Sequence, residues 1–150
     1  MLTSARKTMP ALDYVSVIRS VYGDRRAMLA GLFASALTAG LTAYKTSSLP
    51  LLAVTIAFIV IGLIRYADMR AFWLAAIDSD DAEAAEHWEN RAVLSGSLLA
   101  LVYGMWCLVS MAIVKDPFAA LASASISIAV MVGICARNFG LDRLVTIQMV

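Results

Sequence analysis

Charged residues are scarce in this sequence. Asp, Glu, Lys and Arg make up only 15% of its 150 residues, whereas an average soluble chain carries roughly a quarter. The net charge is only +1, which argues against a nucleic-acid partner, because phosphate recognition needs a basic face. Hydrophobic residues make up 61%, more than a soluble single domain of this size could bury. The composition therefore indicates an integral membrane protein, whose main partner is the lipid bilayer.

Residues suited to catalysis or metal binding are also few. His87 is the only histidine, and neither a His-x-x-x-His nor a Cys-x-x-Cys spacing occurs. The chain also lacks a Ser-His-Asp set and a Gly-rich phosphate loop. We therefore assign no catalytic residue, no cofactor-binding residue and no metal ligand, and we expect no cofactor in this chain.

Long uncharged stretches define the predicted fold. They cover residues 27–44, 46–64, 92–114 and 117–136, and each approaches the ~20 residues that a helix needs to cross about 30 Å of hydrocarbon. A fifth apolar run starts at residue 144 and stops at residue 150, so we expect a chain truncated within a fifth helix. The predicted fold class is all-α: residues 27–150 form a polytopic transmembrane helical bundle with a cytoplasmic helical hairpin.

The first 26 residues form a polar leader, too long for the n-region of an ordinary signal peptide. Within it, Pro10 suits a first helical turn and Gly23 a helix stop. The pattern predicts an amphipathic helix over residues 10–22 that lies in the interface, with its apolar face in lipid or against the bundle. A frayed tail is the alternative. The apolar face would contain four residues at helical spacing: Leu12, Val15, Ile18 and Tyr22.

Basic residues are distributed unevenly between the two predicted sides of the membrane. Only Lys45 and Lys115 fall on one side. The positive-inside rule then predicts a multi-pass membrane protein with its N-terminus in the cytoplasm. The other ten are Arg6, Lys7, Arg19, Arg25, Arg26, Arg65, Arg70, Arg91, Arg137 and Arg143.

The loop between the second and third spans has a helical pattern. Its apolar residues recur at three- and four-residue steps, which predicts that the second span continues as a helix beyond the membrane. Asp80 followed by Glu83 resembles a capping box for a returning helix. We therefore expect a helical hairpin in which Trp73 and Trp88 lie near one another. The apolar stripe comprises Tyr66, Met69, Phe72, Trp73, Ala76 and Ile77.

This predicted hairpin is acidic, with seven carboxylates against three arginines and a net charge of −4. A metal site beside His87 is one interpretation. We prefer a solvated acidic face and first helical turn, where the helix dipole favours negative charge. The carboxylates are Asp68, Asp78, Asp80, Asp81, Glu83, Glu86 and Glu89.

Small residues recur every four positions inside the spans, which predicts close helix packing and is compatible with a homodimer through these faces. A polar permeation path is the alternative, although no ionisable residue lies within a predicted span. The first span carries Ala27, Gly31, Ser35, Ala39 and Ala43, the third Gly96, Ala100 and Gly104, and the fourth Ala119, Ser123 and Ser127.

The two cysteines are expected to be independent packing residues. Cys107 and Cys135 differ in predicted depth by ~20 Å, whereas a disulfide needs Cα atoms within about 7 Å.

Five short segments carry a resemblance to a known family: residues 21–26 (VYGDRR), 66–72 (YADMRAF), 116–121 (DPFAAL), 133–140 (GICARNFG) and 143–148 (RLVTIQ). These segments resemble the membrane-embedded N-terminal region of proteobacterial diguanylate cyclases, the Gly-Gly-Asp/Glu-Glu-Phe (GGDEF) proteins, many of which add a Glu-Ala-Leu (EAL) phosphodiesterase domain. In that family the helical region senses or anchors, and a cytoplasmic domain condenses two GTP molecules into cyclic di-GMP with Mg²⁺.

The catalytic signatures of that family are absent from residues 1–150, so no catalytic residue is carried over. The resemblance implies a membrane-embedded sensory or anchoring domain of a cyclic di-GMP signalling protein. It would relay a signal to a C-terminal cytoplasmic diguanylate cyclase that is not in this chain, and Mg²⁺ and GTP are expected only there. The alternative is a small stand-alone membrane protein or a transporter fragment.

Overall fold

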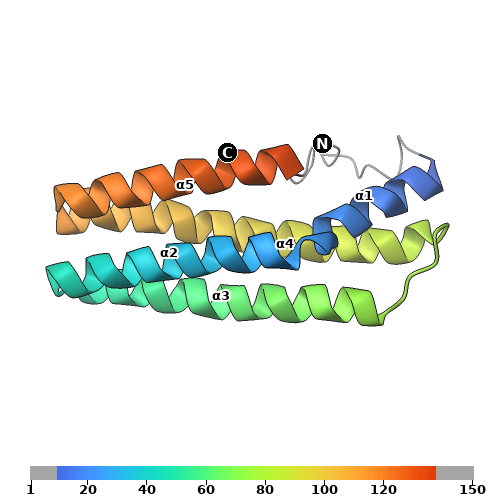
Figure 1. Cartoon of the computed structure of the whole chain (residues 1–150), viewed down its shortest axis with the longest axis horizontal. Coiled ribbons are helices and arrows are strands. Elements are labelled where there is room, and N and C mark those ends of the chain that lie inside the picture. The colour runs from blue at the N-terminus through green and yellow to red at the C-terminus, as the bar shows by residue number, and fades with distance from the viewer. Residues whose placement is uncertain (1–9, 138–150) are drawn as a thin grey trace.

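The computed structural model describes residues 10–137, and side chains as far as residue 133. Within this range the chain is all-α, as predicted, and the expected bundle with a helical hairpin is present (Figure 1). The helices are α1 (Ala11–Gly23), α2 (Arg25–Thr46), α3 (Leu49–Leu74), α4 (Ala82–Leu108), which continues into the π-helix η2 (Val109–Val114), and α5 (Pro117–Arg137).

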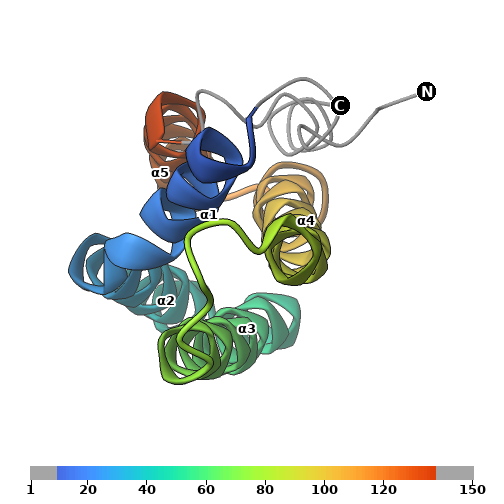
Figure 2. The same cartoon turned by 90° about the vertical axis from the view of Figure 1, so that its right-hand side faces the viewer.

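Helices α2 to α5 form an antiparallel bundle, and α1 crosses its end beside the α3–α4 connection (Figure 2). Arg25 begins α2, and α3 and α4 pass the same end at Arg65 and Arg91. We call this the basic end. The other end carries the α2–α3 and η2–α5 turns and is called the Lys45 end.

Local hydrogen bonds shape the two turns of the Lys45 end. Ser48 caps α3 by accepting the Leu51 N–H, and Pro50 lies in the first turn of that helix, where its missing N–H is tolerated. Asp116 caps α5 by accepting the Ala119 N–H at 2.9 Å. An ion pair of 3.3 Å between Lys45 and Asp116 joins the two turns.

Three helical stretches are long and apolar enough to cross a membrane: Arg25–Thr46, Leu49–Leu74 and Ala82–Val114. The expected fourth span corresponds to α5. The apolar stretch of this helix, Pro117–Gly133, is shorter than the other three, so that α5 crosses the membrane stays a prediction. The expected fifth helix lies outside the described residues. The chain is therefore membrane-associated by the length and polarity of its helices.

Polarity within the bundle is arranged as in a lipid-exposed protein. Large apolar side chains such as Phe33 and Leu121 point outward, each 69% exposed. Hydroxyl side chains such as Thr42 and Ser123 are fully buried and donate to carbonyls of their own helices. Such an exterior would be poorly solvated by water, and small or hydroxyl residues at helix contacts are typical of membrane bundles.

The predicted hairpin is confirmed, with corrections at its ends. Helix α3 continues about ten residues past the predicted span, and α4 begins about ten residues before the next one. The capping residue is Asp81, which accepts the Ala84 N–H at 2.9 Å, so the Asp80 assignment was wrong by one residue. The π-helical end of the third span, closed by the Lys115 N–H to the Ser110 carbonyl, was not predicted.

Candidate functional site

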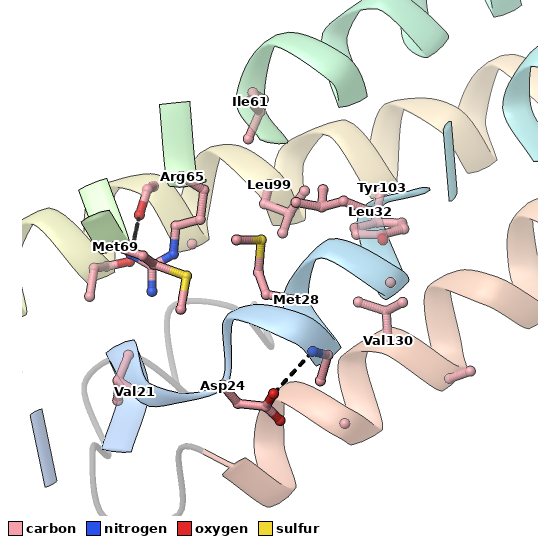
Figure 3. Close-up of a pocket in the computed structure, with 17 residues that line it drawn as sticks. Val21, Asp24, Met28, Leu32, Ile61, Arg65, Met69, Leu99, Tyr103 and Val130 are labelled. Atoms are coloured by element: carbon pink, nitrogen blue, oxygen red, sulfur yellow. Dashed lines mark hydrogen bonds between the residues drawn. The ribbon is translucent and has the colours of Figure 1, made fainter. Parts of the chain in front are cut away.

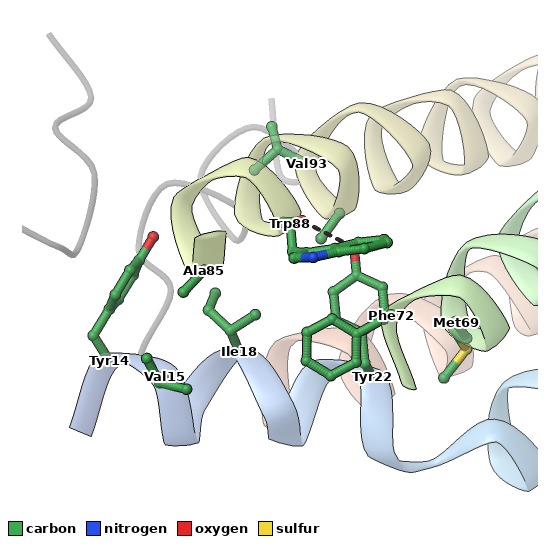
Figure 4. Close-up of a cluster of buried hydrophobic side chains, with 10 residues drawn as sticks. Tyr14, Val15, Ile18, Tyr22, Met69, Phe72, Ala85, Trp88 and Val93 are labelled. Atoms are coloured by element: carbon green, nitrogen blue, oxygen red, sulfur yellow. Dashed lines mark hydrogen bonds between the residues drawn. The ribbon is translucent and has the colours of Figure 1, made fainter. Parts of the chain in front are cut away.

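Helix α1 packs against the hairpin at the basic end (Figure 4). The predicted amphipathic helix is confirmed, and its apolar face lies against the bundle. One residue of that face was wrong: Leu12 is 63% exposed, and Tyr14 is fully buried in its place. The basic-end cluster comprises Tyr14, Val15, Ile18, Tyr22, Met69, Phe72, Ala85, Trp88, Ala92 and Val93.

Three aromatic rings from three helices form the centre of this cluster. Tyr22 of α1 stacks on Phe72 of α3, with ring centroids 4.3 Å apart. Trp88 of α4 meets both rings edge-on, at 5.7 and 5.4 Å. The stripe residues Met69 and Phe72 therefore pack against α1 as well as α4. The predicted helix was too long, because α3 ends at Leu74, so Ala76 and Ile77 lie beyond it. Trp73 is 46% exposed and contacts Phe72, so the expected closeness of Trp73 and Trp88 is mediated by Phe72.

Hydrogen bonds between distant residues fix α1 in this position. The Tyr14 hydroxyl donates to Glu89 at 2.5 Å, and the Tyr22 hydroxyl donates to the Trp88 carbonyl at 2.9 Å. The hairpin also donates a hydrogen bond to α1. The Trp73 indole N–H donates to the carbonyl of Tyr22, in the last turn of α1, at 2.8 Å. Arg19 donates to the Ile77 carbonyl at 2.6 Å. Polar groups at the rim and centre of the contact thus specify one arrangement of α1.

Burial perturbs one titratable group in this cluster. The pKa of Tyr22 is raised above its ordinary value of 10.0, chiefly by desolvation and against the opposing effect of nearby Arg65. The phenol therefore stays protonated at neutral pH, as its role as a donor to the Trp88 carbonyl requires.

Two acids that the sequence placed on a solvated face are buried instead. Glu89 is 1% exposed beside Tyr14, and Asp68 is 7% exposed and pairs with Arg91. The prediction was wrong for these two residues because their partners lie on other helices. His87 is exposed, and the part of the chain that the structure describes contains no group of three metal-ligating side chains.

A cavity of about 290 Å³ lies next to this cluster, inside the bundle (Figure 3). Its wall is mostly apolar, with Met28 and Leu32 of α2, Ile61 of α3 and Leu99 of α4. The polar lining residues are Asp24 at the α1–α2 junction, Arg65, Ser95 and Tyr103. The cavity extends along α4 from Ala92 to Tyr103, about 16 Å at 1.5 Å per residue.

Small residues explain why this space is open. Gly31 of α2 and Gly133 of α5 both line the cavity, and a Cβ at either position would meet nothing within 4 Å. The predicted packing seam of the first span is confirmed only toward the Lys45 end, where Ser35 and Ala39 are fully buried. The predicted seam of the third span was wrong, because Gly104 is exposed while Tyr103 and Trp106 are buried. On α5, Ala119 and Ser123 are buried as expected.

No family model, curated protein or solved structure matches the chain. The resemblance to diguanylate cyclases therefore stays a prediction. The separation of the cysteines is also a prediction, because the Cys135 side chain lies outside the described residues. The Cys107 sulfur lies 3.4 Å from the Ser127 hydroxyl.

Proposed function

We propose that this chain is the sensory or anchoring membrane domain of a signalling protein, with its N-terminus and the α3–α4 hairpin in the cytoplasm of a bacterial inner-membrane protein. The uneven distribution of basic residues supports this orientation. Arg25, Arg65 and Arg91 lie at the basic end, and Lys45 and Lys115 lie at the turns of the opposite end.

The docking of α1 is the observation that carries the proposal. Val21 and Asp24, at the end of α1, line the intramembrane cavity. Tyr14 and Tyr22 of the same helix bond to α4 of the hairpin. A membrane domain transmits a signal only if its helices have two arrangements that the stimulus distinguishes in free energy. Helix α1 contacts both the cavity and the hairpin, so it is the element best placed to couple them.

For the output we propose a cyclic di-GMP enzyme, on the strength of the sequence resemblance. The enzyme would be a cytoplasmic diguanylate cyclase beyond this chain, and it would bind Mg²⁺ and GTP there. Cyclases of this kind join two GTP molecules, so a homodimer through exposed small-residue faces such as that of Gly104 would bring two output domains together.

Orientation can be tested with reporter fusions. Fusions after Lys45 and after Asp116 should report an external location, and fusions after Asp80 and after Gly140 a cytoplasmic one. An external reporter at residue 80 would contradict the proposed topology.

The output can be tested from the reading frame that follows Val150. A downstream GGDEF domain whose cyclase activity changes when Tyr22 is replaced by Phe would support a sensory role, and unchanged activity would indicate an anchor. A frame without such a domain would contradict the cyclic di-GMP proposal and favour a stand-alone membrane protein or a transporter fragment.

A further inference from the structure

The guanidinium of Arg65 is a partly buried charge without a counterion among residues 10–133. It donates to the Ser95 hydroxyl at 2.9 Å and lies 4.9 Å from the centre of the Tyr22 ring, but no described carboxylate is within ion-pair distance. Arg91, at the same end of the bundle, is paired with Asp68. A cation beside an apolar wall attracts an anion more strongly than the same cation does in bulk water, because the dielectric constant near the wall is lower.

The cavity continues from Arg65 into the apolar interior of the bundle (Figure 3). One end of the cavity is lined by the cationic Arg65. Farther in, the wall is apolar and consists of Met28, Leu32, Ile61 and Leu99. This polarity matches an amphiphile with an anionic head and an apolar tail. The volume of about 290 Å³ is at the lower limit of the roughly 300–1,000 Å³ of small-molecule sites, so one hydrocarbon chain fits better than two.

We infer that this cavity binds a single-chain amphiphile with an anionic head, carboxylate or phosphate, placed at Arg65 and with its tail along Leu32, Leu99 and Tyr103. The ligand would be drawn from the membrane leaflet at the basic end. This binding does not depend on the signalling output proposed above. Val21 and Asp24, at the end of α1, line the site. If signalling does occur, ligand binding at this site would act on α1.

Asp24 also lines the cavity and would repel an anion placed beside it. Its carboxylate accepts the Ala27 N–H at 3.0 Å, at the N-terminus of α2, where the helix dipole offsets part of its charge. Arg65 enters from α3, separate from this junction (Figure 3). The head is therefore placed at the Arg65 and Ser95 wall.

Binding can be measured by native mass spectrometry of the full chain released from neutral-detergent micelles. The probes are dodecanoate and dodecyl phosphate, with dodecanol as the neutral analogue and inorganic phosphate as the tail-free anion. We expect saturable one-to-one binding of either anionic amphiphile, at least about tenfold tighter than binding of dodecanol or inorganic phosphate. The relative affinities of dodecanoate and dodecyl phosphate identify the preferred head.

Two variants locate the site, and each has a matched control. R65Q should weaken binding about tenfold or more, because a charge-assisted hydrogen bond is lost, whereas R70Q alters an exposed arginine outside the cavity and should not. G31L should abolish binding by filling the cavity. G104L is its control, since Gly104 has equally open space but lies outside the cavity.

Circular dichroism and thermal unfolding should show that G31L and G104L fold alike. Absence of saturable binding, equal affinity for dodecanol, or equal affinity for inorganic phosphate would overturn the inference. Undiminished binding by G31L would also overturn it, even if R65Q failed to fold.

Discussion

The two ends of the bundle are held together by different means. The Lys45 end also contains aromatic rings, those of Phe58, Tyr103 and Trp106, but buried hydroxyls there, such as those of Thr42 and Ser123, donate to carbonyls of their own helices. The ion pair between Lys45 and Asp116 joins the two turns of this end. At the basic end, aromatic rings and polar side chains join residues far apart in sequence, such as Tyr14 with Glu89 and Trp73 with Tyr22.

The difference follows from the surroundings each end would have. Within hydrocarbon there is no hydrophobic driving force between helices, so close backbone packing and hydroxyl groups hold them together. Near the membrane surface water is present, and aromatic burial together with hydrogen bonds can position an additional helix. The basic end is therefore the part of the molecule where an additional helix, α1, is docked by buried rings and by side-chain hydrogen bonds between helices.

The largest expected effect is that of F72A at the centre of the basic-end cluster. Phe72 is 4% exposed between Tyr22 and Trp88, so its removal should cost about 3–5 kcal/mol. The adjacent W73A should cost less, because Trp73 is 46% exposed. Limited proteolysis at residues 78–81 in membranes measures both. Equal cleavage rates for F72A and W73A would contradict the three-helix packing.

A second effect concerns the buried carboxylate of Glu89. A double-mutant cycle of Y14F and E89A should give a coupling energy of about 1.5–3 kcal/mol for this hydrogen bond, since Ala removes the acceptor. E83A, on the exposed first turn of α4, provides the control and should not couple with Y14F. Thermal unfolding in detergent measures each variant, and zero coupling at Glu89 would show that α1 is not held through this contact.

A third and smaller effect is that of Y22F, which should cost about 1 kcal/mol at neutral pH for the hydrogen bond to Trp88. Because the folded pKa of Tyr22 is raised above 10.0, its contribution is fully present below pH 10 and is lost as pH rises further. Stability of the parent chain should therefore fall more steeply than that of Y22F as the pH rises above 10. Parallel pH profiles would contradict the burial of this phenol.

The smallest effect is expected at the Lys45 end. The pKa of Asp116 is lowered below 3.8, chiefly by the Ala119 N–H and further by Lys45. Its contribution is therefore present above that pH and is lost as pH falls. D116N should change thermal stability little at neutral pH, because the ion pair is surface-exposed. A loss as large as that of F72A would reverse the comparison between the two ends.

Features encoded locally could be predicted from the sequence. The spans, the turn before Pro50 and the amphipathic character of α1 follow from hydropathy and from nearby capping residues. The register of α1 was partly wrong, since Leu12 and Tyr14 are both compatible with a helical stripe.

Features that depend on distant partners could not be predicted. Glu89 is buried because Tyr14, 75 positions earlier, reaches it, and no local pattern distinguishes it from the solvated acids. Gly31 has the spacing of a packing residue, but whether a neighbouring helix fills the space beside it depends on the helix arrangement.

The docking of α1 on the hairpin is the central claim, and photo-crosslinking in membranes tests it most directly. Benzoylphenylalanine at position 14 should crosslink to α4 near Glu89, as identified by mass spectrometry, while the same group at exposed position 12 should not. Crosslinks to α4 from position 12 but not from position 14, or from neither position, would contradict the account.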